Sequence, residues 1–278
     1  MTKLHDAPMV QSLTPLTPSL DAVVIKLGGS ILDVGDAALD DVAALHRAGH
    51  QVVLIHGGGP MINQWLTRLG IVPRFIAGRR VTDSTTLEIV RAVMAGQINT
   101  EIVRLLGLRG IRAVGLSGLD AGMIHVQQAA ADLGLVGLNP SANPVAIQTV
   151  LALPAIPVIT SLGLGPDGAC LNVNADDVAT AIAVALHASD LIFMSDVPGV
   201  RDAAGNVIAE LTAAAAHKLI ADGVIAGGMV PKIQGCLAAI DHVQRIHILA
   251  GQQSGALRAV LGTERHPGTQ IVRESSAS

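Results

Sequence analysis

The chain has 278 residues, half of them apolar, and a formal net charge of only −4, so it can bury a large core as one α/β domain or two lobes. One Trp, two Phe and no Tyr leave no aromatic platform for base stacking, and the mild acidity without Lys/Arg clusters disfavours a nucleic-acid partner. Two cysteines, Cys170 and Cys236, are too few for a disulfide framework or a metal cage, and indicate small core residues in a reducing compartment.

The N-terminal segment offers no targeting signal. Residues 1–20 contain Pro8, Pro15 and Pro18 but no basic region followed by an apolar run. Apolar runs such as Ala181 to Leu186 are far shorter than the roughly 20 residues that cross a bilayer. We therefore expect a flexible leader over residues 1–20, a cytoplasmic location and no membrane partner.

Short β-branched runs then alternate with longer helical segments, which is typical of a mainly parallel sheet covered on both faces. The expected strands are Ala22 to Lys26, Gln51 to Ile55, Arg112 to Leu116, Ile156 to Thr160, Leu191 to Ser195 and Arg245 to Leu249. The expected helices are Asp36 to Ala48, Pro60 to Leu69, Ser84 to Gly107, Ala175 to Ala188, Ala213 to Asp222 and Pro231 to Ile240. The order predicts an open, doubly wound α/β/α sandwich, in which ligands bind beyond the carboxyl ends of the strands.

A glycine-rich stretch near the middle, Gly163 to Gly168, is typical of a flexible turn cluster. We expect it to mark the boundary between an N-terminal lobe, residues 21–165, and a C-terminal lobe, residues 166–278. The sheet can run through both lobes.

The first strand ends in Lys26-Leu27-Gly28-Gly29-Ser30. Glycine leaves backbone N–H groups bare, so phosphate oxygens can approach them, and Lys26 adds a mobile positive charge. A tight turn with a solvated lysine is the alternative interpretation of this segment taken alone.

The second strand ends in His56-Gly57-Gly58-Gly59-Pro60. Three consecutive glycines carry a conformational-entropy cost that a simple connector does not need, which favours a phosphate cradle. Pro60 suits the first turn of the following helix. His56 fits a hydrogen-bonded structural histidine better than a general acid or base.

The order of these turns and of the motifs that follow them resembles the amino acid kinase family. The resemblance covers roughly residues 22–272, in the family's order and spacing. The further motifs are GRRVTD at Gly78 to Asp83, VGLSG at Val114 to Gly118, NVNADD at Asn172 to Asp177, SDVPGV at Ser195 to Val200 and GGMVPK at Gly227 to Lys232.

The resemblance implies a kinase that moves the γ-phosphate of ATP, with Mg²⁺, onto the side-chain carboxylate of N-acetyl-L-glutamate in arginine biosynthesis. Two anionic groups then meet, so charge neutralisation and positioning are the main requirements. Lys26 and Lys232 match the family's two essential lysines, and Asp176 matches the aspartate that holds them apart. Asp176 also suits a helix start, and both roles can coexist.

On the acceptor side, the resemblance implies that Arg80 binds the α-carboxylate, while its neighbour Arg79 is a solvated charge. Neutral amides suit an acylated nitrogen better than a free ammonium group. The implied acceptor-binding residues are Gly58, Gly59, Arg80, Asn172 and Asn174. The implied phosphate- and nucleotide-binding residues are Gly28, Gly29, Gly57, Asp196 and Gly228.

The resemblance implies a different role for each lobe: the N-terminal lobe binds the acyl acceptor and forms the dimer, and the C-terminal lobe binds ATP. A leader without a helical period is similar to that of arginine-insensitive homodimers. Ser117-Gly118-Leu119-Asp120 also occurs in related kinases of a carrier-linked aminoadipate, so that alternative stays open, as do an aspartate or glutamate kinase and a non-catalytic sensor of amino acid or nucleotide on the same fold.

Overall fold

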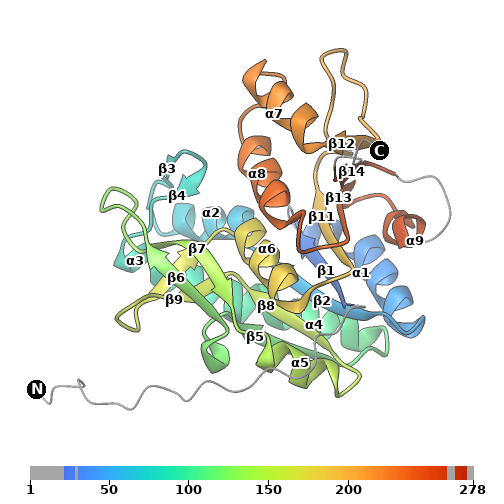
Figure 1. Cartoon of the computed structure of the whole chain (residues 1–278). Coiled ribbons are helices and arrows are strands. Elements are labelled where there is room, and N and C mark those ends of the chain that lie inside the picture. Colours follow the sequence, from blue (N-terminus) through green and yellow to red (C-terminus); the bar gives the residue numbers. More distant parts are fainter. Residues whose placement is uncertain (1–21, 29–30, 262–266, 274–278) are drawn as a thin grey trace, which may run out of the picture.

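A computed structural model describes residues 22–28, 31–261 and 267–273 of the chain (Figure 1). An eight-stranded sheet in the order β12-β14-β13-β11-β1-β2-β8-β5 forms its centre. The strands are β1 Ala22–Leu27, β2 Gln51–His56, β5 Ala113–Ser117, β8 Ile156–Thr160, β11 Asp190–Ser195, β12 Glu210–Thr212, β13 Arg245–Ala250 and β14 Thr269–Val272. Six of the seven neighbouring pairs are parallel and β13–β14 is antiparallel.

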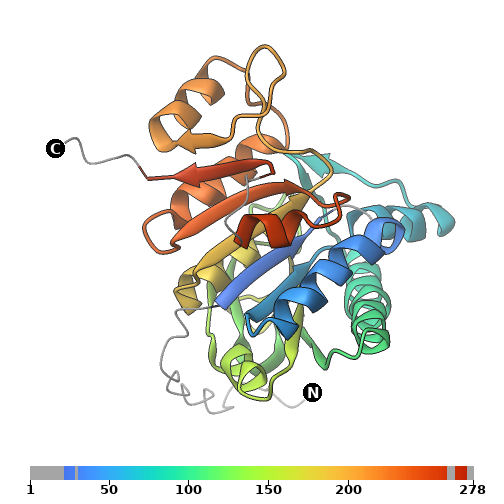
Figure 2. The same cartoon turned by 90° about the vertical axis from the view of Figure 1, so that its right-hand side faces the viewer.

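Helices cover both faces of the sheet (Figure 2). On one face lie α1 Ile31–Arg47, α2 Gly59–Arg68, α3 Ser84–Arg91, the π-helix η1 Ala92–Ile98, α4 Asn99–Leu108 and α9 Ala256–Leu261. On the other lie α5 Val145–Leu151, α6 Ala175–Leu186, α7 Ala213–Ala221 and α8 Met229–Ala239. The residues expected to form one long helix from Ser84 are thus helical to Leu108, but with a π segment in the middle.

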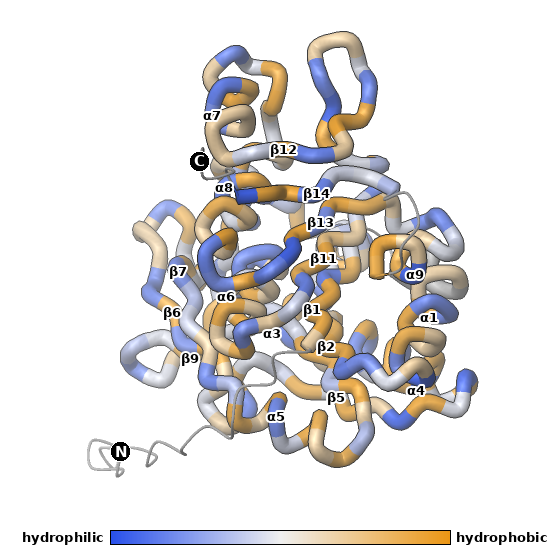
Figure 3. The backbone as a smooth tube through the Cα atoms, turned by 45° about the vertical axis from the view of Figure 1, so that its right-hand side comes forward, coloured by the Kyte–Doolittle hydropathy of each residue, from blue (hydrophilic) through white to orange (hydrophobic). Residues whose placement is uncertain are grey.

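Strand β1 shows why helices pack on both faces of the central sheet. Ala22 and Val24 belong to one hydrophobic cluster, whereas Val23, Ile25 and Leu27 belong to the other. Successive side chains of a strand point to opposite faces, so a continuous apolar run buries both. Figure 3 shows this as largely hydrophobic central strands β13, β11 and β1.

Two smaller sheets lie beside the carboxyl edge. A closed four-stranded barrel has the order β10-β7-β6-β9, with β6 Ile124–Gln128, β7 Val136–Ala142, β9 Leu162–Leu164 and β10 Cys170–Val173. A hairpin consists of β3 Phe75–Ile76 and β4 Arg79–Arg80. Sequence periodicity did not predict either, because their strands are short and only partly apolar.

The glycine-rich stretch from Gly163 to Gly168 connects β9 with β10 in an antiparallel pair. The stretch therefore belongs to the barrel itself. The central sheet contains strands that precede this stretch in the sequence and strands that follow it. The expected leader, residues 1–20, lies outside the described residues. The open, mainly parallel doubly wound α/β architecture is confirmed.

Candidate active site

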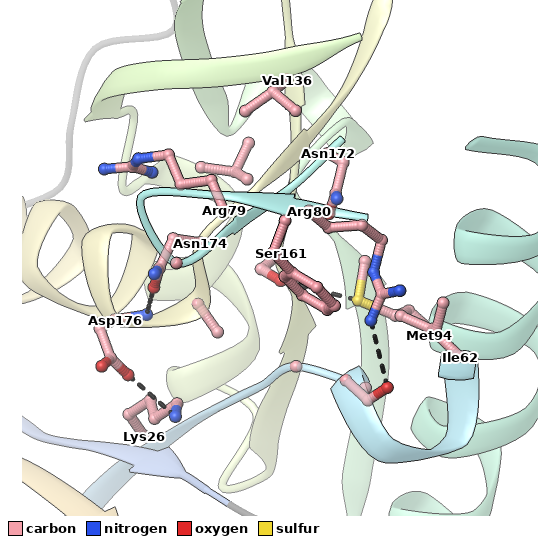
Figure 4. A pocket seen from close by; sticks show the side chains of 17 residues that line it. Lys26, Ile62, Arg79, Arg80, Met94, Val136, Ser161, Asn172, Asn174 and Asp176 are labelled. Carbon is pink, nitrogen blue, oxygen red and sulfur yellow. Dashed lines mark hydrogen bonds and ion pairs between the residues drawn. The ribbon is translucent and has the colours of Figure 1, made fainter. Parts of the chain in front are cut away.

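The parallel strands β1, β2, β8 and β11 end at the same edge of the sheet, and a cavity of about 250 Å³ opens there. Figure 4 shows its lining, with Lys26 and Asp176 at one end and Arg80, Met94 and Ile62 at the other. The cavity brings together the predicted residues Lys26, Gly57, Gly58, Gly59, Arg80, Asn172, Asn174 and Asp176. These residues come from four separate segments of the chain.

At the first end, Asp176 lies between two lysines. Its Oδ1 is 2.8 Å from Lys26 Nζ and its Oδ2 is 2.5 Å from Lys232 Nζ. Burial raises the pKa of Asp176, but the two ammonium charges outweigh burial and hold that pKa below its usual value. The carboxylate therefore stays charged and keeps two like charges close together without direct contact.

Helix α6 and helix α8 supply two of these three side chains. Asn174 caps α6, because its Oδ1 accepts a hydrogen bond from the Asp176 N–H at 2.7 Å. Lys232, on α8, is buried and its Nζ lies 4.9 Å from the centre of the Phe193 ring. The cap sets the start of α6, so it fixes where the central carboxylate stands.

At the other end, Arg80 is buried with an incomplete set of partners. Its Nη2 donates to the Gly59 carbonyl at 3.2 Å and its guanidinium lies 4.8 Å from the Phe75 ring centre. Its buried Nη1 has no hydrogen-bond partner in the described part of the chain. Burial lowers the pKa of Arg80. A buried donor of this kind calls for an anion, and a carboxylate fits the guanidinium fork.

Two amides line the middle of the cavity. Asn172 Nδ2 donates to Thr82 Oγ1 at 3.1 Å, which leaves its carbonyl oxygen to accept. Asn174 Oδ1 is used by the helix cap, which leaves its NH₂ group to donate. The cavity thus offers one neutral acceptor and one neutral donor between its two cationic ends.

Each of the two glycine turns has a position that is tightly packed against neighbouring segments. A Cβ on Gly28 would lie 2.2 Å from the Met194 carbonyl oxygen, and one on Gly58 would lie 2.8 Å from Ile98 Cδ1. Neither position accepts a side chain without a shift. Gly29 lies outside the described residues.

Arg79 is not the solvated charge expected from the sequence. It precedes Arg80 in β4, so the two side chains point in opposite directions, and its Nη1 pairs with Asp177 Oδ2 at 3.0 Å. Burial raises the pKa of Asp177 more than the Arg79 charge lowers it. The pair ties the β3–β4 hairpin to the start of α6, and it also lines a second cavity, of about 560 Å³, between α6, α8 and β7.

Four of the predicted residues do not line this cavity, namely Lys232, Gly28, Asp196 and Gly228. Asp196 is exposed after β11, where its Oδ1 accepts from Ser195 Oγ at 3.0 Å. Gly228 is exposed at the start of α8. Both lie in the C-terminal half, and their assignment to the nucleotide stays a prediction.

Sequence reasoning missed several lining residues, among them Ser161, Met94 and Phe75. Ser161 directly follows β8, so the rule that pointed to the glycine turns also applied to it. Met94 lies in the π-helix, whose geometry no motif announced. The SGLD segment is a local turn in which Asp120 Oδ2 accepts from the Ser117 N–H at 2.6 Å, and it does not line the cavity.

Within the described ranges, no group of three or more His, Cys, Asp or Glu side chains is placed to hold a metal ion. None of the described helices is both long enough and apolar enough to span a bilayer.

Comparisons with known proteins agree with the geometry. The model of the amino acid kinase family matches residues 21–250. An acetylglutamate kinase of Ruegeria pomeroyi is 43% identical over 257 residues, covering 91% of this chain and 89% of its own. One of Sinorhizobium fredii is 42% identical over 267 residues, 90% of each chain. The crystal structure of a Streptococcus mutans protein, smu.665, superimposes with a TM-score of 0.76 at 30% identity, over 91% of this chain and 99% of its own.

Proposed function

Since this chain belongs to the amino acid kinase family, we propose that it transfers the γ-phosphate of ATP to the side-chain carboxylate of N-acetyl-L-glutamate. It is an ATP-dependent phosphotransferase with a carboxyl group as acceptor, in keeping with curated relatives that are named acetylglutamate kinases. The product is N-acetylglutamyl 5-phosphate, an intermediate of arginine biosynthesis.

The charge distribution of the cavity carries this proposal. Among the described lining residues, the only carboxylate is Asp176, and both of its oxygens face lysines. A free amino group on the acceptor would therefore enter without an anionic partner, which is costly in a partly buried site. An acylated nitrogen carries no charge, and the Asn172 carbonyl can accept its N–H. Arg80 suits the α-carboxylate.

The same residues account for the transfer. A side-chain carboxylate oxygen of the acceptor attacks the γ-phosphorus, an O–P bond forms, and the bond to the bridging oxygen of ADP breaks with its electron pair leaving on ADP. No proton has to move, because the nucleophile is already ionised. Lys26 and Lys232 would neutralise the charge on the transferring and leaving oxygens, and Asp176 would keep both lysines charged and oriented. Gly28 and Gly57 would offer backbone N–H groups to the phosphoryl oxygens.

We further propose that Mg²⁺ enters with the nucleotide. Mg²⁺ keeps several of its waters and binds through substrate phosphates together with one or two carboxylates. The ion would neutralise charge on the phosphates of ATP.

The lobes would share binding, with the acceptor held mainly by residues 21–165 together with Asn172 and Asn174, and ATP mainly by residues 166–278. Asp196 and Gly228 would then contact the nucleotide, and the enzyme would work in the cytoplasm.

We propose a homodimer formed through the N-terminal lobe. Five of the eight exposed large apolar side chains in the described residues lie between Trp65 and Ile76, and a partner subunit would cover them. A size measurement with and without arginine tests this assembly. A dimer indifferent to arginine is expected, and a monomer or an arginine-responsive hexamer contradicts it.

The activity test is ATP-dependent acyl phosphate formation, trapped with hydroxylamine as the hydroxamate. N-acetylglutamate, glutamate, aspartate and N-acetylaspartate are compared as acceptors. Activity with N-acetylglutamate is expected and should be lost in Lys232→Ala, whereas Lys218→Ala, at an exposed lysine on α7, should retain it. Inactivity with every free amino acid would favour a carrier-bound acceptor or a sensor instead.

A further inference from the structure

His56 is a buried side chain at the base of the glycine turn and takes no part in the transfer described above. Its Nδ1 lies 2.9 Å from the carbonyl oxygen of Gly57, and its Nε2 lies 3.1 Å from Nδ2 of Asn99. Only 1% of its surface is exposed. A histidine held at both ring nitrogens has a defined tautomer, which its partners determine.

Asn99 settles that tautomer. Its Nδ2 lies 2.8 Å from the Val158 carbonyl oxygen and 3.4 Å from that of Leu116. Carbonyl oxygens only accept, so this atom of the amide must be the nitrogen. Its hydrogens therefore also face Nε2 of His56, which must accept. The proton then resides on Nδ1, and His56 donates to the carbonyl of Gly57.

The fold makes room for this arrangement. A Cβ on Gly115 would lie 2.1 Å from Oδ1 of Asn99, so only glycine lets the amide reach His56. Ile98 and Met94, from the π-helix that precedes Asn99, pack where a Cβ of Gly58 would stand, at 2.8 and 3.0 Å. The continuous helical segment that contains Met94, Ile98 and Asn99 thus contacts both His56 and Gly58. Short π segments are frequent at functional sites.

Holding the Gly57 carbonyl has a direct consequence for the next amide. In a trans peptide unit the C=O and the following N–H point in opposite directions. When the carbonyl points inward to the His56 ring, the N–H of Gly58 points away from it, on a turn that lines the cavity. This N–H makes no hydrogen bond to the described part of the chain.

We infer that His56 and Asn99 are positioning residues that fix the Gly57–Gly58 peptide, so that the Gly58 N–H donates to the anionic oxygens where acceptor carboxylate and γ-phosphate meet. The inference rests on the proposed function and adds two positioning residues to the same site. A donor held in place before the reaction stabilises developing charge without a reorganisation cost. His56 acts through the backbone and touches neither substrate.

Two substitutions separate the roles of the two ring nitrogens. The side-chain nitrogen of Asn occupies a place similar to Nδ1, so His56→Asn can still donate to Gly57. The end of Gln reaches the place of Nε2, so His56→Gln keeps the contact with Asn99 and loses the donor to Gly57. We expect His56→Gln to lower kcat about 10- to 100-fold, with the KM of both substrates within about threefold, and His56→Asn to retain a larger share of kcat.

The matched control is His247→Gln, since His247 is also fully buried but lies on β13 away from the turn. It should lower the melting temperature with no change in kcat at temperatures where the protein stays folded. Equal losses of kcat in His56→Asn and His56→Gln, in proportion to their losses of melting temperature, would show a packing role alone and overturn the inference.

A second readout needs no activity. In protein labelled with ¹⁵N-histidine, the His56 ring, identified by its absence from the His56→Gln spectrum, should carry its proton on Nδ1 between about pH 5.5 and 8. Asn99→Asp should move the proton to Nε2 and lower kcat. A wild-type Nε2–H tautomer would overturn the inference while leaving the kinase activity intact. An Nδ1–H tautomer in a protein inactive with all four acceptors would instead contradict the proposed function.

Discussion

The two ends of the candidate site are built differently. At the acceptor end, buried side chains and glycines are held by one another: Arg80 by Gly59, Asn172 by Thr82, and the Gly57 carbonyl by His56. At the end that we propose binds the nucleotide, Asp196 and Gly228 are exposed, and Asp196 bonds only its neighbour Ser195 among the described residues. The acceptor end is thus assembled in the free protein.

The lysine pair joins these ends. Lys26 comes from β1 and lines the cavity, whereas Lys232 comes from the first turns of α8, the helix that begins after the exposed Gly228. Both reach the same carboxylate. We therefore expect specificity for the acceptor to come from packed elements, and the proposed nucleotide end to be completed by the bound ligand.

The largest effect should come from the shared lysines. We expect Lys26→Met and Lys232→Met each to lower kcat by about 10³-fold, because each removes a fixed positive charge from the transferring phosphoryl group. Initial rates of ADP release at saturating substrate measure this. Lys218→Met is the matched control, since Lys218 forms an exposed pair with Asp222 on α7. A drop of less than tenfold in either site variant would contradict the assigned role.

Replacing the adjacent arginines tests the acceptor end alone. Arg80→Ala should raise the KM of the acceptor about 10- to 100-fold, the equivalent of one charged hydrogen bond, and leave the KM of ATP unchanged. Arg79→Ala should have a smaller effect, because the Arg79 guanidinium is paired with Asp177. Equal effects of both variants would mean that the hairpin as a whole, and not the buried guanidinium, recognises the acceptor.

Gly→Ala substitutions at Gly58 and at Gly228 compare how tightly the two proposed ends of the site are packed. Gly58→Ala should lower stability by about 1–3 kcal/mol, because the new Cβ would meet Ile98 and Met94. Gly228→Ala should leave stability unchanged, because nothing lies within 4 Å of that position. Urea unfolding measures both. A stable Gly58→Ala protein would show that the second glycine turn is looser than described.

The last effect is a pH dependence of stability, which develops only in acid. Burial lowers the pKa of His56 from 6.5 to about 4, against the opposing bond to Gly57. The unfolded chain binds the proton more readily, so the stability from neutral His56 is complete above about pH 6.5 and is lost as pH falls towards 4, by up to about 3 kcal/mol.

His56→Gln should therefore flatten the stability curve between pH 4 and 6.5. Part of the slope will remain, because burial also lowers the pKa of His46. Urea unfolding of both proteins at half-unit steps of pH gives the comparison, and parallel curves would contradict a neutral, buried His56.

Much of this site could be predicted from the sequence, for a physical reason. Glycines after buried strands, and Lys26 at a strand end, follow from backbone rules that act locally. Arg79 could not be placed this way, because its partner Asp177 lies 98 positions away and a one-residue change of strand register would exchange it with Arg80. The link from Asn99 to His56 depends on a π segment and on the space left by Gly115, and neither has a local pattern.

We propose that the cavity selects an N-acylated acidic amino acid over the free amino acid. The most direct measurement is the ratio of kcat/KM for N-acetyl-L-glutamate to that for L-glutamate, from hydroxamate formation at saturating MgATP. We expect a ratio of about 10³ or more, because a free ammonium group would enter a cavity whose lining offers it no uncommitted carboxylate. A ratio near one, or a preference for glutamate, would contradict it.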